Sequence, residues 1–350
     1  MNYQRSILIF VIFLLIAAVD VFAQDVEMIR LSDKVIVLNV LGLDCRTNIV
    51  VISSQKGLVV IDTEISPHVM KILKEAAEKY FKRQDWIYAI NTHGHIHHIY
   101  GNVLFKDVNI IGQESLIQRF PNEKIFQLPK SGQKQFISYS EPISQLRQML
   151  RTINDPQQAQ VLRERIRFLN IVNREWRDGF ELVRPNITFR DRLTLNLGDI
   201  NLDLIDFDCG IETNHKAILV YIEEENILVD VGGKWLPNIN ENATFDTISR
   251  YIKILKELVD KEVRIVIPCH SDFASIEDLQ AQYDYMTDML DGITEARQEG
   301  LSLQQIKNQF SLEERYAHLS RLWSGSQPEK VAQKHENNIE RIWNFPLQDD

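Results

Sequence analysis

Four of the nine histidines in the sequence lie within the short segment Thr92–His98, namely His93, His95, His97 and His98. The segment follows directly after the apolar run Trp86–Ile90. Imidazole nitrogens suit Zn²⁺ and related first-row metals, and a short loop after a strand can direct several of them at one point. The spacing therefore indicates a metal site. The alternative is a surface histidine tract that binds metal adventitiously, but the flanking residues are apolar and include glycine.

The segment Asn91–Asn102 resembles the His-x-His-x-Asp-His signature of the metallo-β-lactamase superfamily. The preceding run Gly57–Thr63 is similar to the strand and aspartate that come before that signature in the superfamily. Pro185–Asp199 and the tail near Asn338–Arg341 resemble secreted hydrolase-like members. The resemblance covers most of the chain, and it implies an αββα sandwich that carries a metal-dependent hydrolase site.

The resemblance also implies which residues bind metal. Glu212 stands where the superfamily has the third histidine of the first metal site, and His270 matches the final histidine. His97 replaces the aspartate that binds the second metal, and Gly232 replaces the bridging aspartate. Asp230 is either a substitute for that aspartate or a structural carboxylate. The implied metal ligands are His93, His95, His97, His98, Glu212 and His270.

This altered set predicts two unequal metal positions. His93, His95 and Glu212 form a His₂Glu set of the kind that hydrolytic zinc enzymes use. The second position would be made only of imidazoles, from His97, His98 and His270, and would lack an anionic ligand. We expect one Zn²⁺ with the second position weak or empty. Ligand type alone does not separate zinc from iron.

Three functions follow from this site. In the first, a metal-activated water attacks an ester, lactone, amide or related bond of a small molecule, with His97 as the candidate catalytic proton acceptor. In the second, the chain is a non-catalytic exported metal- or ligand-binding protein descended from such hydrolases. The third is mononuclear iron oxidation chemistry, which also occurs on this fold. Nothing in the sequence identifies the substrate.

The remaining cysteines and histidines are weaker candidates. Cys269, beside His270, and Cys209, near Glu212, are alternative soft ligands, although a buried cysteine more often serves as a small hydrophobic residue. A site role for His215 is left open. We expect three further histidines at the surface, namely His68, His318 and His335.

The elements that must position these residues alternate in type along the chain. Strands are expected at Lys34–Val40, Asn48–Ser53, Gly57–Asp62, Trp86–Ile90, Ile187–Phe189, Leu193–Leu197, Asn201–Phe207, Ala217–Ile222, Asn226–Val231 and Val263–Pro268. Helices are expected at Val69–Phe81, with Ser66 as the N-cap, and at Phe245–Asp260. Two helices are expected within Glu141–Gly179, the second opened by Asp155 as its N-cap. Most of the tail is also expected to be helical, with Ser302 and Gln305 marking the start of one helix. The predicted fold class is α/β: a metallo-β-lactamase-like αββα domain over residues 24–275, with a helical insertion at about 139–180 and a helical extension over 276–350.

Composition excludes some partners. The formal net charge of −10 is a poor match for nucleic acid, and three cysteines cannot form a disulfide scaffold. A hydrophobic content of 44% and a charged content of 25% are ordinary for a folded globular protein.

The N-terminus predicts export. Residues 1–23 carry Arg5, the apolar run Ile7–Val19 and small residues at Val21 and Ala23, which is the layout of a cleaved signal peptide. The apolar run is shorter than the ~20 residues that span a bilayer, which argues against an uncleaved anchor. We predict a periplasmic or secreted protein that starts at Gln24, and N-terminal sequencing of protein from its native host checks this. Intact Met1 in the membrane fraction would instead indicate an anchor.

Overall fold

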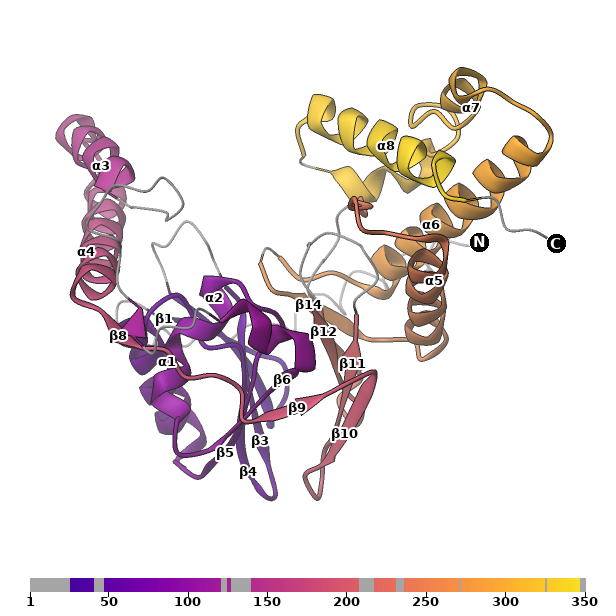
Figure 1. Ribbon diagram of the computed structural model, residues 1–350. Helices are drawn as coiled ribbons and strands as arrows, with labels where there is room; N and C mark the ends of the chain where they lie inside the picture. The colour runs from indigo at the N-terminus through magenta and orange to yellow at the C-terminus, as the bar shows by residue number, and fades with distance from the viewer. Residues whose placement is uncertain are drawn as a thin grey trace, which may run out of the picture. The chain divides into compact units, whose positions relative to one another are not determined.

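The computed structural model describes residues 26–40, 47–120, 125–126, 140–207, 217–230, 236–270, 272–324 and 326–346 (Figure 1). The chain forms two compact units. The first comprises Met1–Ile90, Ile96–Ile110 and Pro121–Arg184, and the second comprises Asn91–His95, Ile111–Phe120 and Pro185–Asp350. The expected signal peptide lies outside the described residues and stays a prediction.

The first unit is built on a sheet that starts as an antiparallel meander. Its strands are β1 (Val26–Arg30), β2 (Val35–Val40), β3 (Ile49–Ser54), β4 (Gly57–Ile61) and β5 (Trp86–Ile90). β4 and β5 are parallel, and α1 (Pro67–Phe81) connects them. As predicted, α1 begins after Ser66, whose Oγ accepts a hydrogen bond from the Val69 amide at 3.2 Å. The parallel pairing brings the carboxyl-terminal ends of β4 and β5 to one edge of the sheet.

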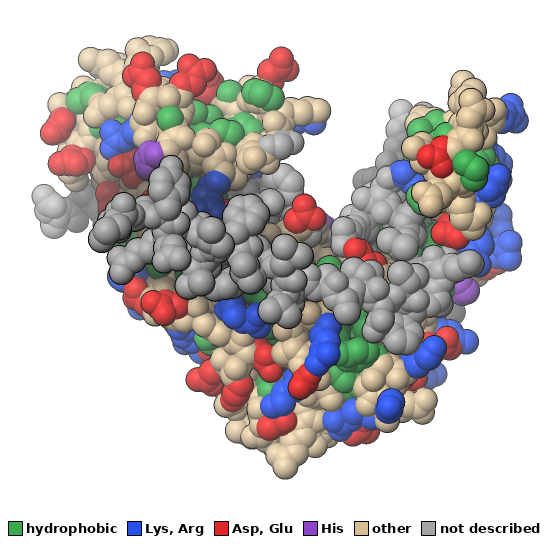
Figure 2. All heavy atoms as spheres, turned by 180° about the vertical axis from the view of Figure 1, so that it is seen from behind, with side chains coloured by type: hydrophobic (Ala, Val, Ile, Leu, Met, Phe, Trp, Pro, Cys, Tyr) green, Lys and Arg blue, Asp and Glu red, His purple; other side chains and the backbone are tan. Residues whose placement is uncertain are grey.

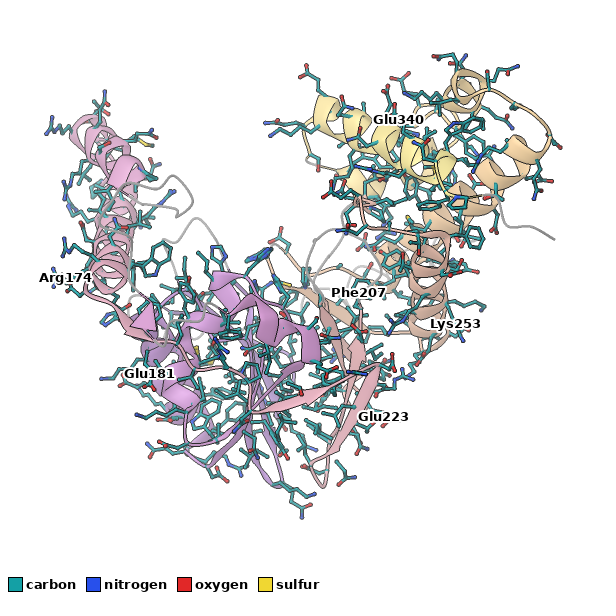
Figure 3. All side chains as sticks on the ribbon, viewed as in Figure 1. Arg174, Glu181, Phe207, Glu223, Lys253 and Glu340 are labelled. Carbon is teal, nitrogen blue, oxygen red and sulfur yellow. The ribbon has the colours of Figure 1, made fainter. Side chains whose placement is uncertain are left out.

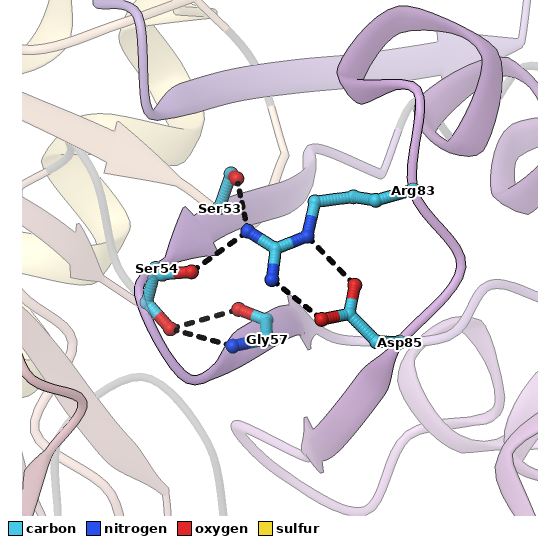
Figure 4. A network of polar contacts seen from close by, with 5 residues as sticks. All are labelled: Ser53, Ser54, Gly57, Arg83 and Asp85. Carbon is cyan, nitrogen blue, oxygen red and sulfur yellow. Dashed lines mark hydrogen bonds and ion pairs between the residues drawn. The ribbon is translucent and has the colours of Figure 1, made fainter.

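A polar network fixes the opposite ends of β4 and β5 (Figure 4). The Arg83 guanidinium donates to the Ser54 carbonyl at 2.8 Å and from Nε to the Asp85 carboxylate at 2.7 Å. This pairing with Arg83 holds the pKa of Asp85 below its usual value. Gly57 has φ +148°, and a Cβ there would lie 2.5 Å from the Asp85 carbonyl oxygen. Only glycine therefore fits this turn without strain.

The expected helical insertion is a pair of helices, α3 (Ser140–Thr152) and α4 (Pro156–Asp178). Asp155 caps α4 by accepting hydrogen bonds from the Gln157 and Gln158 amides. Near the other end of α4, the buried Trp176 donates from Nε1 to the Ile65 carbonyl at 3.2 Å. The insertion thereby contacts the segment that follows β4. Arg174 and Glu181 mark this region in Figure 3.

The second unit contains a five-stranded sheet and β9 (Ile187–Phe189), which pairs in parallel with β6 (Asn109–Gln113) from Ile111 onward. The sheet runs in the order β10 (Arg192–Asn196), β11 (Asn201–Asp206), β12 (Ile218–Ile222), β13 (Ile227–Asp230) and β14 (Ile265–Pro268). Its pairs are antiparallel except for β13 and β14, which are parallel and connected through α5 (Phe245–Asp260). Phe207, labelled in Figure 3, packs on Tyr251 of α5 with ring centroids 5.1 Å apart.

The C-terminal helices share one apolar core with this sheet. They are α6 (Ile276–Gln298), α7 (Leu303–Gln309), the 3-10 helix η4 (Ala317–Trp323) and α8 (Pro328–Trp343). Their buried side chains join those of α5 and β14 in a single cluster, which includes Val266, Leu255, Met286 and Ile339. The expected capping box at Ser302 and Gln305 is present at the start of α7.

The surface of the described residues is mixed in charge. Acidic and basic side chains are interspersed on the face that Figure 2 shows. Among the helices that the structure describes, none has the length and apolar character needed to cross a membrane.

His335 corrects one expectation, because it lies in the core of the C-terminal helices and not at the surface. It is only 4% exposed and belongs to the buried face of α8 with Val331 and Ile339. Its Nε2 lies 2.6 Å from the Phe310 carbonyl, which can only accept, so Nδ1 accepts from the Tyr285 hydroxyl at 2.9 Å. This arrangement requires a neutral imidazole, and burial lowers the pKa of His335 below its ordinary 6.5.

We therefore predict that acid weakens the C-terminal helices through His335. Because the pKa is lower in the folded chain, the stabilisation is complete above pH 6.5 and is lost as the pH falls, by at most about 1.4 kcal/mol per pH unit. His335→Gln should remove this part of the pH dependence of the free energy of unfolding, measured by denaturant titration at pH 7.5 and 5. The exposed His318→Gln should leave it unchanged. Equal pH dependence in both variants contradicts the assignment.

Candidate metal centre

The histidine segment starts where β5 ends. The Asp62 amide, directly after β4, donates to the Ile90 carbonyl at 2.8 Å, so the ends of β4 and β5 are joined by a hydrogen bond. Gly101 is also required by packing, since a Cβ there would lie 1.9 Å from the Thr63 carbonyl oxygen. Two distant segments of the first unit, one around Asp62 and one after His95, are thus held together.

Two predicted ligands face each other within the second unit. Nε2 of His93 lies 2.9 Å from Nδ1 of His95, and the Thr92 hydroxyl lies 3.1 Å from Nδ1 of His93. The Thr92 carbonyl accepts from the Ile218 amide at 2.8 Å, which fixes the loop to the start of β12. The hydroxyl therefore occupies one ring nitrogen of His93 and turns the other toward His95.

The loop after β14 contributes further donors to the same unit. Cys269 is buried, and its Sγ and a ring nitrogen of His93 lie within 4.8 Å of each other. His270, the next residue, is half-buried. A bridge between Val266 and Ala274 closes this loop. The end of β14, distant in sequence, therefore lies beside the histidine segment.

The first unit carries the other two histidines on the short helix α2 (Ile96–Ile99). His98 is fully buried, and its Nδ1 lies 2.7 Å from Oδ2 of the buried Asp62. The Asp62 carboxylate accepts a hydrogen bond from Nδ1–H, which leaves Nε2 as the unprotonated nitrogen, and in other proteins such pairs orient metal-binding histidines. His97 is half-buried, with its ring centroid 6.3 Å from that of His98.

A second buried carboxyl lies beside Asp62. Glu64 is 1% exposed, and its Oε2 accepts from the Ile65 amide at 2.7 Å. Burial raises the pKa of Glu64 to about 8, with the hydrogen bond from the Ile65 amide acting to lower it and the nearby Asp62 acting to raise it. Both residues have φ +66°, a conformation that non-glycine residues rarely adopt. Glu64 is therefore a neutral acid at pH 7 in a strained segment.

These donors fit a first-row dication. The buried imidazole of His93 and the half-buried one of His95 do not pack as apolar groups, and their two ring nitrogens approach to 2.9 Å. Bound to one tetrahedral metal, they would sit roughly 3.3 Å apart, which a small rotation provides.

The structure places the predicted ligands as follows. It brings His93 to His95, and it pairs His98 with Asp62, an aspartate that the resemblance had marked without a role. Glu212, Gly232, His215 and Cys209 lie outside the described residues, and of Asp230 only the backbone is described. Sequence reasoning missed the burial of Glu64. The only local signal for it was an acidic residue directly after a buried strand.

Comparison with known proteins finds a match to one family over part of the chain. The sequence model of the metallo-beta-lactamase superfamily matches residues 42–115, a range that contains Asp62 and the whole histidine segment. The fold is accordingly the expected α/β, αββα class, with α3 and α4 inserted and α6 to α8 following it.

Solved structures with a similar fold include an alkylsulfatase and a metallo-beta-lactamase. The stereoselective inverting sec-alkylsulfatase Pisa1 from Pseudomonas sp. is 15% identical with a TM-score of 0.50, over 90% of this chain and 49% of its own. This chain thus spans about half the length of the alkylsulfatase. A metallo-beta-lactamase from Pontibacter korlensis is 16% identical with a TM-score of 0.47, over 75% of this chain and 99% of its own. No curated protein matches the sequence.

We predict that Glu64 makes the stability of the folded chain depend on pH. Because its pKa rises from 4.5 to about 8 on folding, stability is complete below pH 4.5 and falls as the pH rises to about 8, by at most about 1.4 kcal/mol per unit. Glu64→Gln keeps an acceptor for the Ile65 amide but cannot ionise. We expect it to be more stable than wild type at pH 8 and similar at pH 4.5, by denaturant titration. The exposed Glu181→Gln is the matched control, and a Glu64→Gln variant that is no more stable at pH 8 would contradict the prediction.

Proposed function

We propose that the protein is a metal-dependent hydrolase of small molecules that acts on an ester, lactone, amide or related bond. The observation that carries the proposal is the convergence of His93 Nε2 and His95 Nδ1 at 2.9 Å. With His93 buried and His95 half-buried, two imidazoles held this close serve no packing purpose that an apolar pair would not serve better. Because one similar fold is that of a sec-alkylsulfatase, sulfate esters join the bonds worth testing.

Different residues of the chain bind the metal, orient its ligands and accept the proton. His93, His95 and Glu212 hold the metal, Zn²⁺ in our proposal, and Thr92 and Asp62 orient the imidazoles of His93 and His98. A bound dication supplies Lewis-acid chemistry and lowers the pKa of water. His97, half-buried, accepts the proton because a histidine titrates near neutral pH and can pass the proton to solvent. Export to the periplasm or outside the cell remains part of the proposal.

The second candidate is an exported binding protein that no longer hydrolyses anything. The ligand changes at His97 and Glu212 favour it, because the superfamily pattern has aspartate and histidine at these positions. The two functions differ in turnover and not in metal content. Measuring turnover and metal content on one preparation therefore distinguishes the two functions.

We predict that the number of anionic ligands controls metal content and turnover. Glu212→Gln should lower metal affinity by more than the roughly 10- to 100-fold that loss of an outer partner costs. His97→Asp restores the superfamily pattern and should raise the metal content toward two per chain. Metal is measured by elemental analysis and titration calorimetry on protein purified without chelator, and hydrolysis with chromogenic esters, lactones, lactams and sulfate esters.

His318→Ala, at an exposed position of η4, is the control and should behave as wild type. Chelator should abolish hydrolysis, and Zn²⁺ should restore it. Bound metal without turnover on the whole panel would support the binding protein. Full metal content in Glu212→Gln, together with unchanged stoichiometry in His97→Asp, would overturn the proposed ligand set.

A further inference from the structure

The Cys269 thiol lies beside a proposed metal ligand. It is 1% exposed, and its Sγ and a ring nitrogen of His93 lie within 4.8 Å of each other. In a tetrahedral site, nitrogen at about 2.0 Å and sulfur at about 2.3 Å from the metal lie roughly 3.5 Å apart. A small side-chain rotation in the loop after β14 is enough to reach that separation.

The surroundings of Cys269 differ from those of an ordinary core cysteine. Val266, on β14, packs in the apolar core with the residues of α5 and α6. Cys269 lies just past the end of the same strand, next to His270 in sequence and beside the imidazole of His93. A buried hydrophobic cysteine needs no imidazole as its neighbour.

A Cys269 thiolate would help to compensate the positive charge of a bound metal. The imidazoles are neutral when they bind a metal, and His97 stands where the superfamily has an anionic aspartate. Glu212 is then the one anion among the proposed ligands His93, His95 and Glu212, and it leaves a bound dication with one uncompensated positive charge. A metal-bound thiol is deprotonated and supplies one negative charge.

We propose that Cys269 is a thiolate ligand of the metal and shares it with His93. This inference rests on the proposed metal site and deepens it. A soft thiolate combined with imidazoles selects Zn²⁺ and Co²⁺ over Mg²⁺, Ca²⁺ and Mn²⁺, which prefer oxygen ligands. The site thereby regains an anionic ligand from β14 in place of the one lost at His97.

Cobalt substitution tests this directly, because a Co²⁺ thiolate absorbs in the near ultraviolet and Co²⁺ bound only by nitrogen and oxygen does not. We expect the band when the whole wild-type protein is titrated with Co²⁺. Cys269→Ser should lose the band and bind Co²⁺ at least about 10-fold more weakly. Cys269→Asp, which keeps the charge, should lose the band but retain more affinity than the serine variant.

The other two cysteines provide matched controls. Cys45→Ser and Cys209→Ser should keep the band, and circular dichroism checks that every variant is folded. A band that survives in Cys269→Ser, or that disappears only in Cys209→Ser, overturns the inference and leaves the proposed function intact. Wild-type protein that binds Co²⁺ without this band also overturns the inference and leaves the proposed function intact. Wild-type protein that binds neither Co²⁺ nor Zn²⁺ overturns both.

Discussion

The parallel pairing of β4 and β5 is the constraint on which the rest of the first unit's site depends. It brings the ends of both strands to one edge, where the Asp62 amide bonds to the Ile90 carbonyl at 2.8 Å. Asp62 can then meet His98, far along the chain, with a single carboxylate-to-imidazole contact. The Arg83 network at the opposite strand ends holds this register, and α1 provides the connection.

Charge is the second constraint. Of the carboxyls beside the histidines, Asp62 is engaged by His98, and Glu64 is neutral near pH 7 because burial raises its pKa to about 8. In the proposed metal site, the anions that would compensate a bound dication are Glu212 and Cys269, so these two residues matter more than the number of histidines.

The C-terminal helices pack against the strand that leads to Cys269 and His270. The loop that carries Cys269 and His270 is closed by the bridge between Val266 and Ala274 and leads directly into α6. Val266 and the buried face of α6 share one apolar core, to which α8 adds its own face. The helices therefore support the strand end from which two candidate ligands project, and His335 links their packing to pH.

Local signals in the sequence were sufficient to predict several helices and the position of the histidine segment. Capping residues and apolar periodicity located α1, α4 and α5, and four clustered histidines located the candidate site and indicated its superfamily. The sequence did not reveal β1 or β6, the burial of His335, the pairing of Asp62 with His98, or the approach of Cys269 to His93. Helix capping and apolar periodicity involve residues only a few positions apart, so they can be recognised in the sequence alone. The other features depend on which distant strands and helices pack together, and that is decided only by the tertiary structure.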